Sequence, residues 1–356
     1  MTDELRPAFC TYAEVDPLHR NRRGIDPEAA EDHALNLAWT RDEREHLDVD
    51  LNAILADELR AEGEHRTYLD RYLVRDPYGE QTLGPAIAGA FGVPDRPNQI
   101  TCGAGVVSLL HGLARLAPRD SIRILGDVYP DFPYWVAQHA APSRGAPLWF
   151  LERPSLLANS HDTLDDVIAL SEDAARCGAI VIIDESNANY YPLTWSAIRV
   201  AASRNNLVII RGFSKAYGLG SLRLGFCFAA PALAQRIRSS IAPLLASSLS
   251  LRLGARVLSL GDVAAPLRGR IAANKRAALD IVAGIGVEAL IPAAEHLPYV
   301  LSRASRDHLA NKLESRGVFG KHHPQWSQAS GTTSIYRLSV PLRESRASRF
   351  RQLLGQ

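Results

Sequence analysis

One lysine, Lys215, stands among small residues in the segment RGFSKAYGLGSLRLGF (211–226), with Arg223 eight positions later. Burial among small groups disfavours the charged form of a lysine, and its neutral amine can then form a Schiff base with an aldehyde. Glycines around it would let such a ligand approach the backbone closely. A solvated lysine in a glycine-rich turn and an ordinary edge arginine would give the same residues, so this segment alone leaves both readings open.

Two other segments carry groups of complementary chemistry. TCGAGVVSLLHGLARL places Gly103, Ala104 and Gly105 at the start of an apolar helix, where free backbone N–H groups bind phosphate. A tight turn without a ligand is the alternative for these small residues. Asp184 ends the apolar run AIVIID, and a buried carboxylate there needs a cation or hydrogen-bond donors. Capping of the following turn is the alternative role for Asp184.

Short apolar runs alternate with longer amphipathic runs in the middle of the chain. The apolar runs are rich in Ile and Val and predict strands at 121–129, 146–152, 179–185 and 206–214. The segment 163–178 predicts a helix between two of them, with Thr163 and Asp166 at its start and Gly178 at its end. This order predicts an α/β fold with a mostly parallel sheet covered by helices on both faces.

Polar side chains follow several of these strands. Ligands bind at the carboxyl ends of strands in such sheets. Tyr129, Glu152, Asp184 and Lys215 each come at the end of an apolar run or shortly after it. We therefore expect a ligand site at this edge of the sheet.

The length of 356 residues predicts two subdomains, because one hydrophobic core seldom supports so long a chain. We expect a large ligand-binding domain over residues 46–255. After about residue 255, the runs 295–303 and 334–342 and a helix near 306–316 predict a smaller α+β domain, over 256–356. Residues 1–45 are expected to form an N-terminal arm that packs with it.

Composition excludes several classes of protein. Forty Lys and Arg residues balance 39 Asp and Glu residues, and the net charge of +1 gives no drive toward nucleic acid or a membrane. The four cysteines are scattered, which favours a reducing cytoplasm. The chain starts without the pattern of a signal peptide, and no run reaches the roughly 18 apolar residues of a membrane span. His322 and His323 have no suitably spaced partner, so no metal site is expected.

A phosphate cradle, a carboxylate for a ring nitrogen, a lysine for an aldehyde and an arginine for a phosphate together describe pyridoxal 5′-phosphate (PLP). SKAYGLGSLRLGF (214–226) resembles the lysine segment of class I/II PLP-dependent aminotransferases of fold type I, and most resembles the histidinol-phosphate aminotransferase branch. The likeness runs from about residue 72 to residue 342.

The resemblance implies a role for each matching residue. Lys215, Asp184 and Tyr129 would be catalytic: Lys215 binds the aldehyde and moves a proton, Asp184 pairs with the ring nitrogen, and Tyr129 stacks on the ring. The phosphate would be bound by Gly103, Ala104, Gly105, Ser214 and Arg223. Asn159 and Asn187 would face the ring hydroxyl, and Arg337 would clamp the substrate carboxylate.

The resemblance also implies partners for the chain. We expect a homodimer in which Tyr78 reaches the phosphate in the partner's site, although Tyr72 and Arg75 compete for that role. Lys321 and His322 in GKHHPQW would bind a second anionic group of the substrate, with a solvated loop as the alternative.

Three departures from the family pattern affect the side of the cofactor that carries its ring hydroxyl. We call this the oxygen side of the cofactor. Asn187 stands where the family usually has tyrosine, and Gly212 replaces a hydroxyl residue three positions before the lysine. LLANSHD replaces the usual Asn-Pro-x-Gly turn. An amide would tune the cofactor less than a phenol.

The expected reaction is transamination between an amino acid and a keto-acid acceptor. Orientation of the scissile bond decides whether the α-carbon loses its proton or its carboxylate. A lyase, decarboxylase or cyclase acting on a modified amino acid is therefore the alternative. The rebuilt oxygen side favours an unusual substrate in specialised metabolism such as antibiotic biosynthesis. A PLP-binding sensor fused to a DNA-binding module is disfavoured by the near-zero charge and by the short N-terminal segment.

Overall fold

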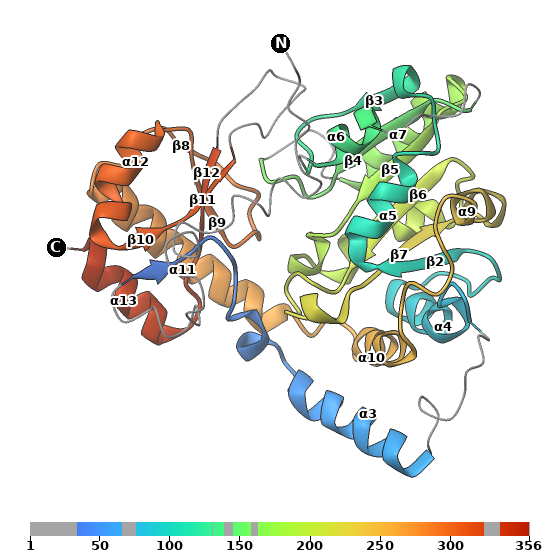
Figure 1. Cartoon of the computed structure of the whole chain (residues 1–356), viewed down its shortest axis with the longest axis horizontal. Helices are drawn as coiled ribbons and strands as arrows, with labels where there is room; N and C mark the ends of the chain where they lie inside the picture. The colour runs from blue at the N-terminus through green and yellow to red at the C-terminus, as the bar shows by residue number, and fades with distance from the viewer. Residues whose placement is uncertain are drawn as a thin grey trace.

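A six-stranded sheet forms the centre of the larger part of the molecule (Figure 1). The computed structural model describes residues 34–65, 76–129, 131–138, 145–157, 163–323 and 335–355. The strand order is β2-β7-β6-β5-β4-β3. The strands are β2 (Ile100–Ala104), β3 (Ile122–Ile124), β4 (Leu148–Glu152), β5 (Ile180–Asp184), β6 (Leu207–Gly212) and β7 (Leu224–Ala229).

Strands β3, β4, β5 and β6 run parallel, and β7 pairs antiparallel with both β6 and β2. The four predicted strands correspond to β3, β4, β5 and β6, so the predicted fold class is confirmed. Glu152 and Asp184 are register partners at the carboxyl ends of β4 and β5. The polar residues that follow these strands therefore gather at one edge of the sheet.

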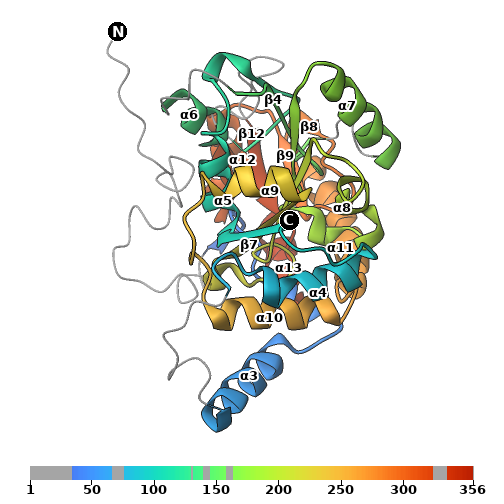
Figure 2. The same ribbon diagram turned by 90° about the vertical axis from the view of Figure 1, so that its right-hand side faces the viewer.

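Helices cover both faces of this sheet because its buried strands are apolar on both faces. In β5, Val181 and Ile183 pack in a core with α4, α7, α8 and α10, whereas Ile180 and Ile182 pack in a second core with α5, α6 and α9. The helices are α4 (Glu80–Phe91), α5 (Gly105–Leu113), α6 (Asp131–Gln138), α7 (Leu164–Arg176), α8 (Ile198–Ala201), α9 (Pro231–Arg238) and α10 (Ser248–Ser259). Helix α3 (Leu51–His65) extends from this body beside α10 (Figures 1 and 2).

Local chemistry explains the start of α7. The Thr163 hydroxyl accepts a hydrogen bond from the Asp166 backbone N–H at 3.1 Å, and the Asp166 carboxylate accepts one from the Thr163 backbone N–H at 3.1 Å. This reciprocal capping box is the one that the sequence predicts.

A smaller α+β unit follows the large sheet. Its antiparallel sheet has the order β11-β12-β9-β8, and β1 pairs in parallel with β10. The strands are β1 (Leu35–Asn36), β8 (Leu290–Ile291), β9 (Tyr299–Ser302), β10 (Val318–Phe319), β11 (Lys321–His323) and β12 (Ile335–Ser339). The helices are α11 (Ala265–Gly284), α12 (Arg306–Lys312) and α13 (Glu344–Leu354). Leu35 and Leu37 belong to this unit's core.

Two details differ from the sequence predictions. The predicted domain boundary at 255/256 falls inside α10, whose Val257 and Leu258 pack in a core of the large sheet. Gly103 and Ala104 form the end of β2, which pairs with β7, with Gly103 opposite Gly225, and Ala104 is also the N-cap residue of the helix that follows. Helix α5 begins at Gly105. Among the described helices, none is long and apolar enough to cross a bilayer.

Candidate active site

One cavity of about 320 Å³ lies where the carboxyl ends of β4, β5 and β6 face the smaller unit. It brings together eight of the predicted site residues: Tyr129, Asp184, Asn187, Ser214, Lys215, Arg223, Lys321 and Arg337. The lining also includes Glu152, which the sequence analysis placed at this edge of the sheet without a role, and residues that it did not assign to the site: Trp39, Thr40, Val106, Val107, Leu110, Leu156, Ser186, Gly220 and Tyr299.

Lys215 lies in the loop after β6 and is half-buried at the cavity wall. The Asn189 side-chain amide donates to the Gly212 carbonyl at 2.6 Å and to the Lys215 carbonyl at 3.4 Å. The next residue, Ala216, has a φ of 61°, a left-handed conformation that is rare for residues other than glycine. The backbone on both sides of Lys215 is thus held in a defined conformation.

Gly212 has a steric reason to lack a side chain. A Cβ at this position would lie 2.7 Å from Cγ2 of Val106, at the start of α5. A hydroxyl residue of the family pattern would therefore fit here only if the Val106 side chain shifted.

A cationic corner forms where α5 begins. Arg223 Nη2 donates to the Ala104 carbonyl at 3.3 Å, and Nη1 donates to the Gly220 carbonyl at 3.3 Å. A Cβ on Gly105, which has a φ of 75°, would lie 2.5 Å from Arg223 Nη2. The guanidinium therefore packs directly against the start of a helix, where free backbone N–H groups point outward.

The residues that line this corner start at Val106, three positions after Gly103, the first residue of the predicted segment. Val106 and Val107 line the cavity. A Cβ on Gly103 would instead meet the side chain of Ser108 at 2.5 Å and that of Leu109 at 2.7 Å. Gly103 therefore serves packing between β2 and α5, and does not face the cavity.

Asp184 is both a turn cap and a cavity residue. Its Oδ1 accepts a hydrogen bond from the Ser186 backbone N–H at 2.8 Å, as the capping alternative requires. The residue is only 2% exposed, and burial raises the pKa of its carboxyl from 3.8 to about 6. Such a carboxyl would ionise more readily beside a cationic ring nitrogen.

Glu152 places a second carboxyl beside Asp184. Its Oε1 accepts a hydrogen bond from the Tyr129 backbone N–H at 2.5 Å, and the residue is buried. Burial and the nearby charge of Asp184 raise the pKa of Glu152 well above its usual value. Its position after an apolar run placed it at this edge of the sheet in the sequence analysis, which gave it no chemical role.

Tyr129 presents its ring to the cavity and is fixed at both ends. Its backbone is held by Glu152, and its hydroxyl donates to Asp131 Oδ2 at 2.6 Å. The ring is thereby oriented before any ligand binds.

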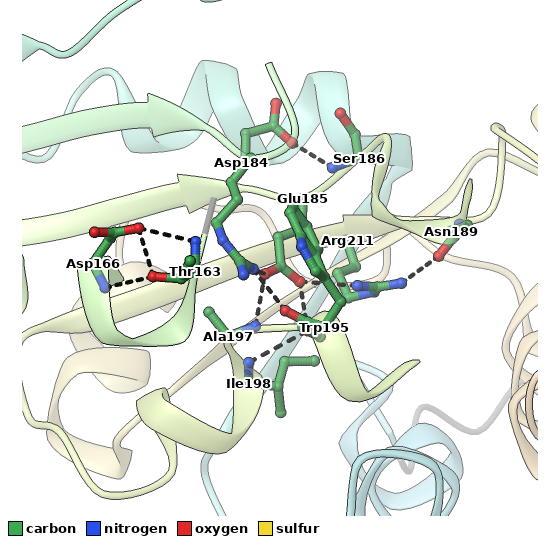
Figure 3. Close-up of polar contacts among 12 residues, drawn as sticks. Thr163, Asp166, Asp184, Glu185, Ser186, Asn189, Trp195, Ala197, Ile198 and Arg211 are labelled. Carbon is green, nitrogen blue, oxygen red and sulfur yellow. Dashed lines mark hydrogen bonds and ion pairs between the residues drawn. The ribbon is translucent and has the colours of Figure 1, made fainter. Parts of the chain in front are cut away.

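A buried ion cluster lies beneath the ends of the strands (Figure 3). We call Arg153, Glu185, Asn189 and Arg211 the Glu185 cluster. Glu185 accepts from Arg153 Nη1 at 2.9 Å and from Arg211 Nη1 at 2.9 Å, and Arg211 Nη2 donates to Asn189 Oδ1 at 2.6 Å. Because Asn189 also holds the Lys215 loop, the cluster links β4, β5 and β6 to the lysine.

Two cations line the wall contributed by the smaller unit. Lys321 and Arg337 are register partners on β11 and β12, and both are buried. Lys321 Nζ lies 4.2 Å from the centre of the Trp39 ring, and Arg337 Cζ lies 4.5 Å from that of Tyr299. Arg337 Nη2 donates to the Ala38 carbonyl at 3.0 Å, while its buried Nε has no hydrogen-bond partner among the described residues.

His322 and Tyr78 are two further predicted site residues that do not line the cavity. His322 follows Lys321 on β11 and does not line the cavity, because successive side chains of a strand point to opposite faces. Tyr78 also lies outside the cavity, and its ring packs 4.7 Å from Arg238 Cζ. Asn159 lies outside the described residues, as do Tyr72 and Arg75.

The described residues contain no group of three or more His, Cys, Asp or Glu side chains arranged to hold a metal ion. The cavity instead combines an amine, two carboxyls, a cationic corner and two buried cations. This combination suits an organic ligand that carries a phosphate, together with an anionic substrate.

The fold and cavity define a class of enzyme that binds a phosphorylated cofactor at the strand ends of an α/β sheet. Residues 160–338, which make up half of the chain, match the sequence profile of the family aminotransferase class I and II. The chain therefore belongs to the class I and II aminotransferase family. This finding confirms the family resemblance of the lysine segment.

Two curated relatives are similar to parts of the chain. The histidinol-phosphate aminotransferase of Stenotrophomonas maltophilia (strain R551-3) is 38% identical over 103 residues, which cover 29% of this chain and 28% of the relative. That of Paenarthrobacter aurescens (strain TC1) is 27% identical over 248 residues, which cover 62% of this chain and 65% of the relative. The chain thus spans less than two thirds of either relative.

Solved structures share the fold. Histidinol-phosphate aminotransferase from Clostridium acetobutylicum superposes with a TM-score of 0.70 at 15% identity, covering 90% of this chain and 98% of that one. The Sinorhizobium meliloti enzyme, in complex with pyridoxal-5′-phosphate, gives 0.66 at 20% identity over 97% and 98% of the two chains. L-threonine-O-3-phosphate decarboxylase from Porphyromonas gingivalis gives 0.63 at 17% identity over 90% and 98%. Fold type I, the PLP-dependent transferase fold, is confirmed.

Proposed function

We propose that the chain is a PLP-dependent aminotransferase that acts on the α-amino group of an amino acid carrying a second anionic group. The observation that carries this proposal is the single cavity into which Lys215, Asp184, Arg223 and Arg337 converge. These residues come from four separate segments, including both structural units. Each supplies a group that PLP or an amino-acid substrate requires.

The residues present fit PLP. Lys215 would hold its aldehyde, Asp184 its ring nitrogen, and Arg223 with Ser214 and the start of α5 its phosphate. Tyr129 would lie against the ring. The cradle between Gly105 and Arg223 and the raised pKa of Asp184 support this assignment.

Asn187 supports the placement of the cofactor's oxygen side. Its Oδ1 is buried and lacks a hydrogen-bond partner among the described residues, and the side chain lines the cavity. A buried polar atom without a partner is costly. A ligand hydroxyl would satisfy it.

When bound, PLP supplies an electron sink for the bonds of the substrate α-carbon. The chain's own residues do the rest. Asp184 stabilises a proton on the ring nitrogen, and the ring of Tyr129 restricts the plane of the ligand. Lys215 is placed to accept the proton from the substrate α-carbon and to return it to another atom.

The smaller unit supplies the substrate-binding groups. Arg337 would pair with the α-carboxylate, and its unpartnered Nε gives it a donor to spare. Lys321, its register partner, would bind a second anion on the same substrate. His322 is dropped from this role, because it does not line the cavity.

A decarboxylase is the second candidate. It is favoured by the replacement of the usual tyrosine by Asn187 in a fold that the Porphyromonas gingivalis decarboxylase shares. The bond of the substrate that stands perpendicular to the cofactor plane would decide between the two reactions.

The biological setting forms part of the same proposal. We place the enzyme in the cytoplasm, as a homodimer, in specialised metabolism. The scattered cysteines support the cytoplasmic location. Tyr78 supports the homodimer. It lies outside the cavity of its own chain and would be available to a partner's site. The departures from the family pattern on the oxygen side of the cofactor support specialised metabolism.

Product analysis tests the reaction. The PLP-loaded enzyme is incubated with a panel of amino acids, including phosphorylated and dicarboxylic ones, with and without a keto acid, and Lys215→Ala serves as the inactive control. A transaminase turns over only with the acceptor. Sustained release of carbon dioxide or ammonia without the acceptor would replace the proposal with a decarboxylase or lyase.

A further inference from the structure

The Glu152 carboxyl is a buried acid that the proposed mechanism leaves without a role. Glu152 and Asp184 are Cα register partners on adjacent parallel strands, so their side chains leave the same face of the sheet at the same edge. Both line the cavity, and they are 5% and 2% exposed. The two carboxyl groups therefore belong to the same edge of the sheet and the same cavity, and both are shielded from water.

Each carboxyl is held from a different side. Glu152 accepts the Tyr129 backbone N–H, whereas Asp184 accepts the Ser186 backbone N–H. Both of these donors are backbone N–H groups, which carry no full positive charge. A backbone N–H stabilises a carboxylate less than a guanidinium does.

The charges around Glu152 come from several elements. Asp184 on β5 and Asp127 after β3 disfavour its ionised form, and Lys215 after β6 favours it. Arg223, Lys321 and Arg337 line the same cavity. Two like charges on adjacent strand ends in a buried site repel strongly, and such pairs release their protons in two separated steps.

We propose that Glu152 is a positioning residue that holds one proton jointly with Asp184 and thereby sets the charge that Asp184 presents to the cofactor ring. The proton occupies either a Glu152 oxygen or an Asp184 oxygen, and whichever carboxyl lacks it is ionised. The pair then carries one negative charge, matched to one positive charge on a ring nitrogen. The effect on the ring rests on the proposed function, but the shared proton does not.

Glu152 also contacts Tyr129. The Glu152 carboxyl, through its hydrogen bond to the Tyr129 backbone, connects the ring-stacking residue with Asp184. A change in the protonation of the pair would therefore affect both Tyr129, at the face of the ligand ring, and Asp184, at its ring nitrogen.

Carboxyl NMR of the cofactor-free chain tests the proposal. Glutamate side chains are labelled with carbon-13 and titrated in the wild type, Glu152→Gln and the control Glu58→Gln. Glu58 is also buried, but it accepts from Arg252 Nε at 3.1 Å and Arg256 Nη1 at 3.2 Å. In the wild type, we expect one glutamate carboxyl to have a higher pKa than all the others. Its signal should be absent in Glu152→Gln and present in Glu58→Gln.

A second variant keeps the test decisive if Glu152→Gln fails to fold. In Asp184→Asn, the highest glutamate pKa should fall, because the neighbouring negative charge is gone. If no glutamate titrates above the others, or if that pKa is unchanged in Asp184→Asn, the shared proton is refuted.

The loaded enzyme gives a third measurement. The absorbance of bound PLP should titrate in one step fewer in Glu152→Gln than in the wild type, and an unchanged titration would refute the influence on the ring. The NMR result is independent of catalysis, so its failure leaves the proposed function standing. Inactivity toward every amino acid would instead overturn the proposed function alone.

Discussion

Adjacent residues of the same two strands hold buried charge in two different ways. On one side of the strand ends, Glu185 binds the guanidinium groups of Arg153 and Arg211. On the other side, Glu152 and Asp184 are register partners on neighbouring strands and accept backbone N–H groups. Figure 3 shows the side chains of Asp184 and Glu185 directed away from each other.

This difference indicates that one group of residues supports the fold and that the other takes part in the chemistry of the site. A buried acid with two hydrogen-bonded guanidinium partners is compensated for the loss of water, and it fixes the geometry around it. Two neighbouring buried acids stay partly protonated and can respond to a ligand. The Glu185 cluster should therefore govern stability, whereas the Glu152–Asp184 side should govern reactivity.

The largest effect is expected at Lys215, on the cavity side. Lys215→Ala removes the group that binds the aldehyde and moves the proton, and should reduce kcat by about a thousandfold or more. The unfolding midpoint should stay near that of the wild type, since the side chain is half-buried and at the cavity wall. Activity assays and denaturant unfolding of the same preparation measure both; appreciable residual turnover would remove Lys215 from its role.

On the cluster side, Glu185→Ala should lower the free energy of unfolding by about 3–5 kcal/mol, because it leaves two buried guanidinium groups without their acid. The matched control is Glu172→Ala, which breaks the exposed ion pair with Arg204 and should cost less than about 1 kcal/mol. Urea unfolding measures both variants. Equal losses would show that burial does not distinguish these pairs.

Asp184 should make stability depend on pH. Its folded pKa of about 6 lies above the ordinary value of 3.8, so its stabilising contribution is complete at low pH and is lost as the pH rises from about 4 through 6. Two pKa units correspond to about 3 kcal/mol. Asp184→Asn should remove this loss in the cofactor-free protein. A pH profile of unfolding identical to that of the wild type would contradict the burial of an ionising acid.

The smallest effect is expected at Asn187, where no charge changes. Asn187→Tyr restores the phenol of the family pattern and should shift the titration of bound PLP by on the order of one pH unit, since a phenol is a stronger partner for the ring oxygen. Spectrophotometric titration measures this shift. An unchanged spectrum would place Asn187 out of contact with the cofactor.

Local sequence determined the elements and much of the chemistry. The capping box of Thr163 and Asp166 starts α7, because both bonds form between residues three apart. Buried apolar runs with β-branched residues gave β4, β5 and β6, and the residues after them pointed to one edge of the sheet. Lys215 and Asp184 were recognisable because their types and small neighbours suit one cofactor.

Contacts between distant segments decided the rest. Gly103 lies in β2 because it pairs with Gly225, more than a hundred residues away, and that pairing moved the start of the helix to Gly105. Trp39 and Tyr299 reach the cavity only because the smaller unit packs against the strand ends. Glu152 and Asp184 become a pair through strand register, which depends on which strands are neighbours. Side-chain types set what each residue can do, but the burial and charges that tune them come from residues far away in the chain.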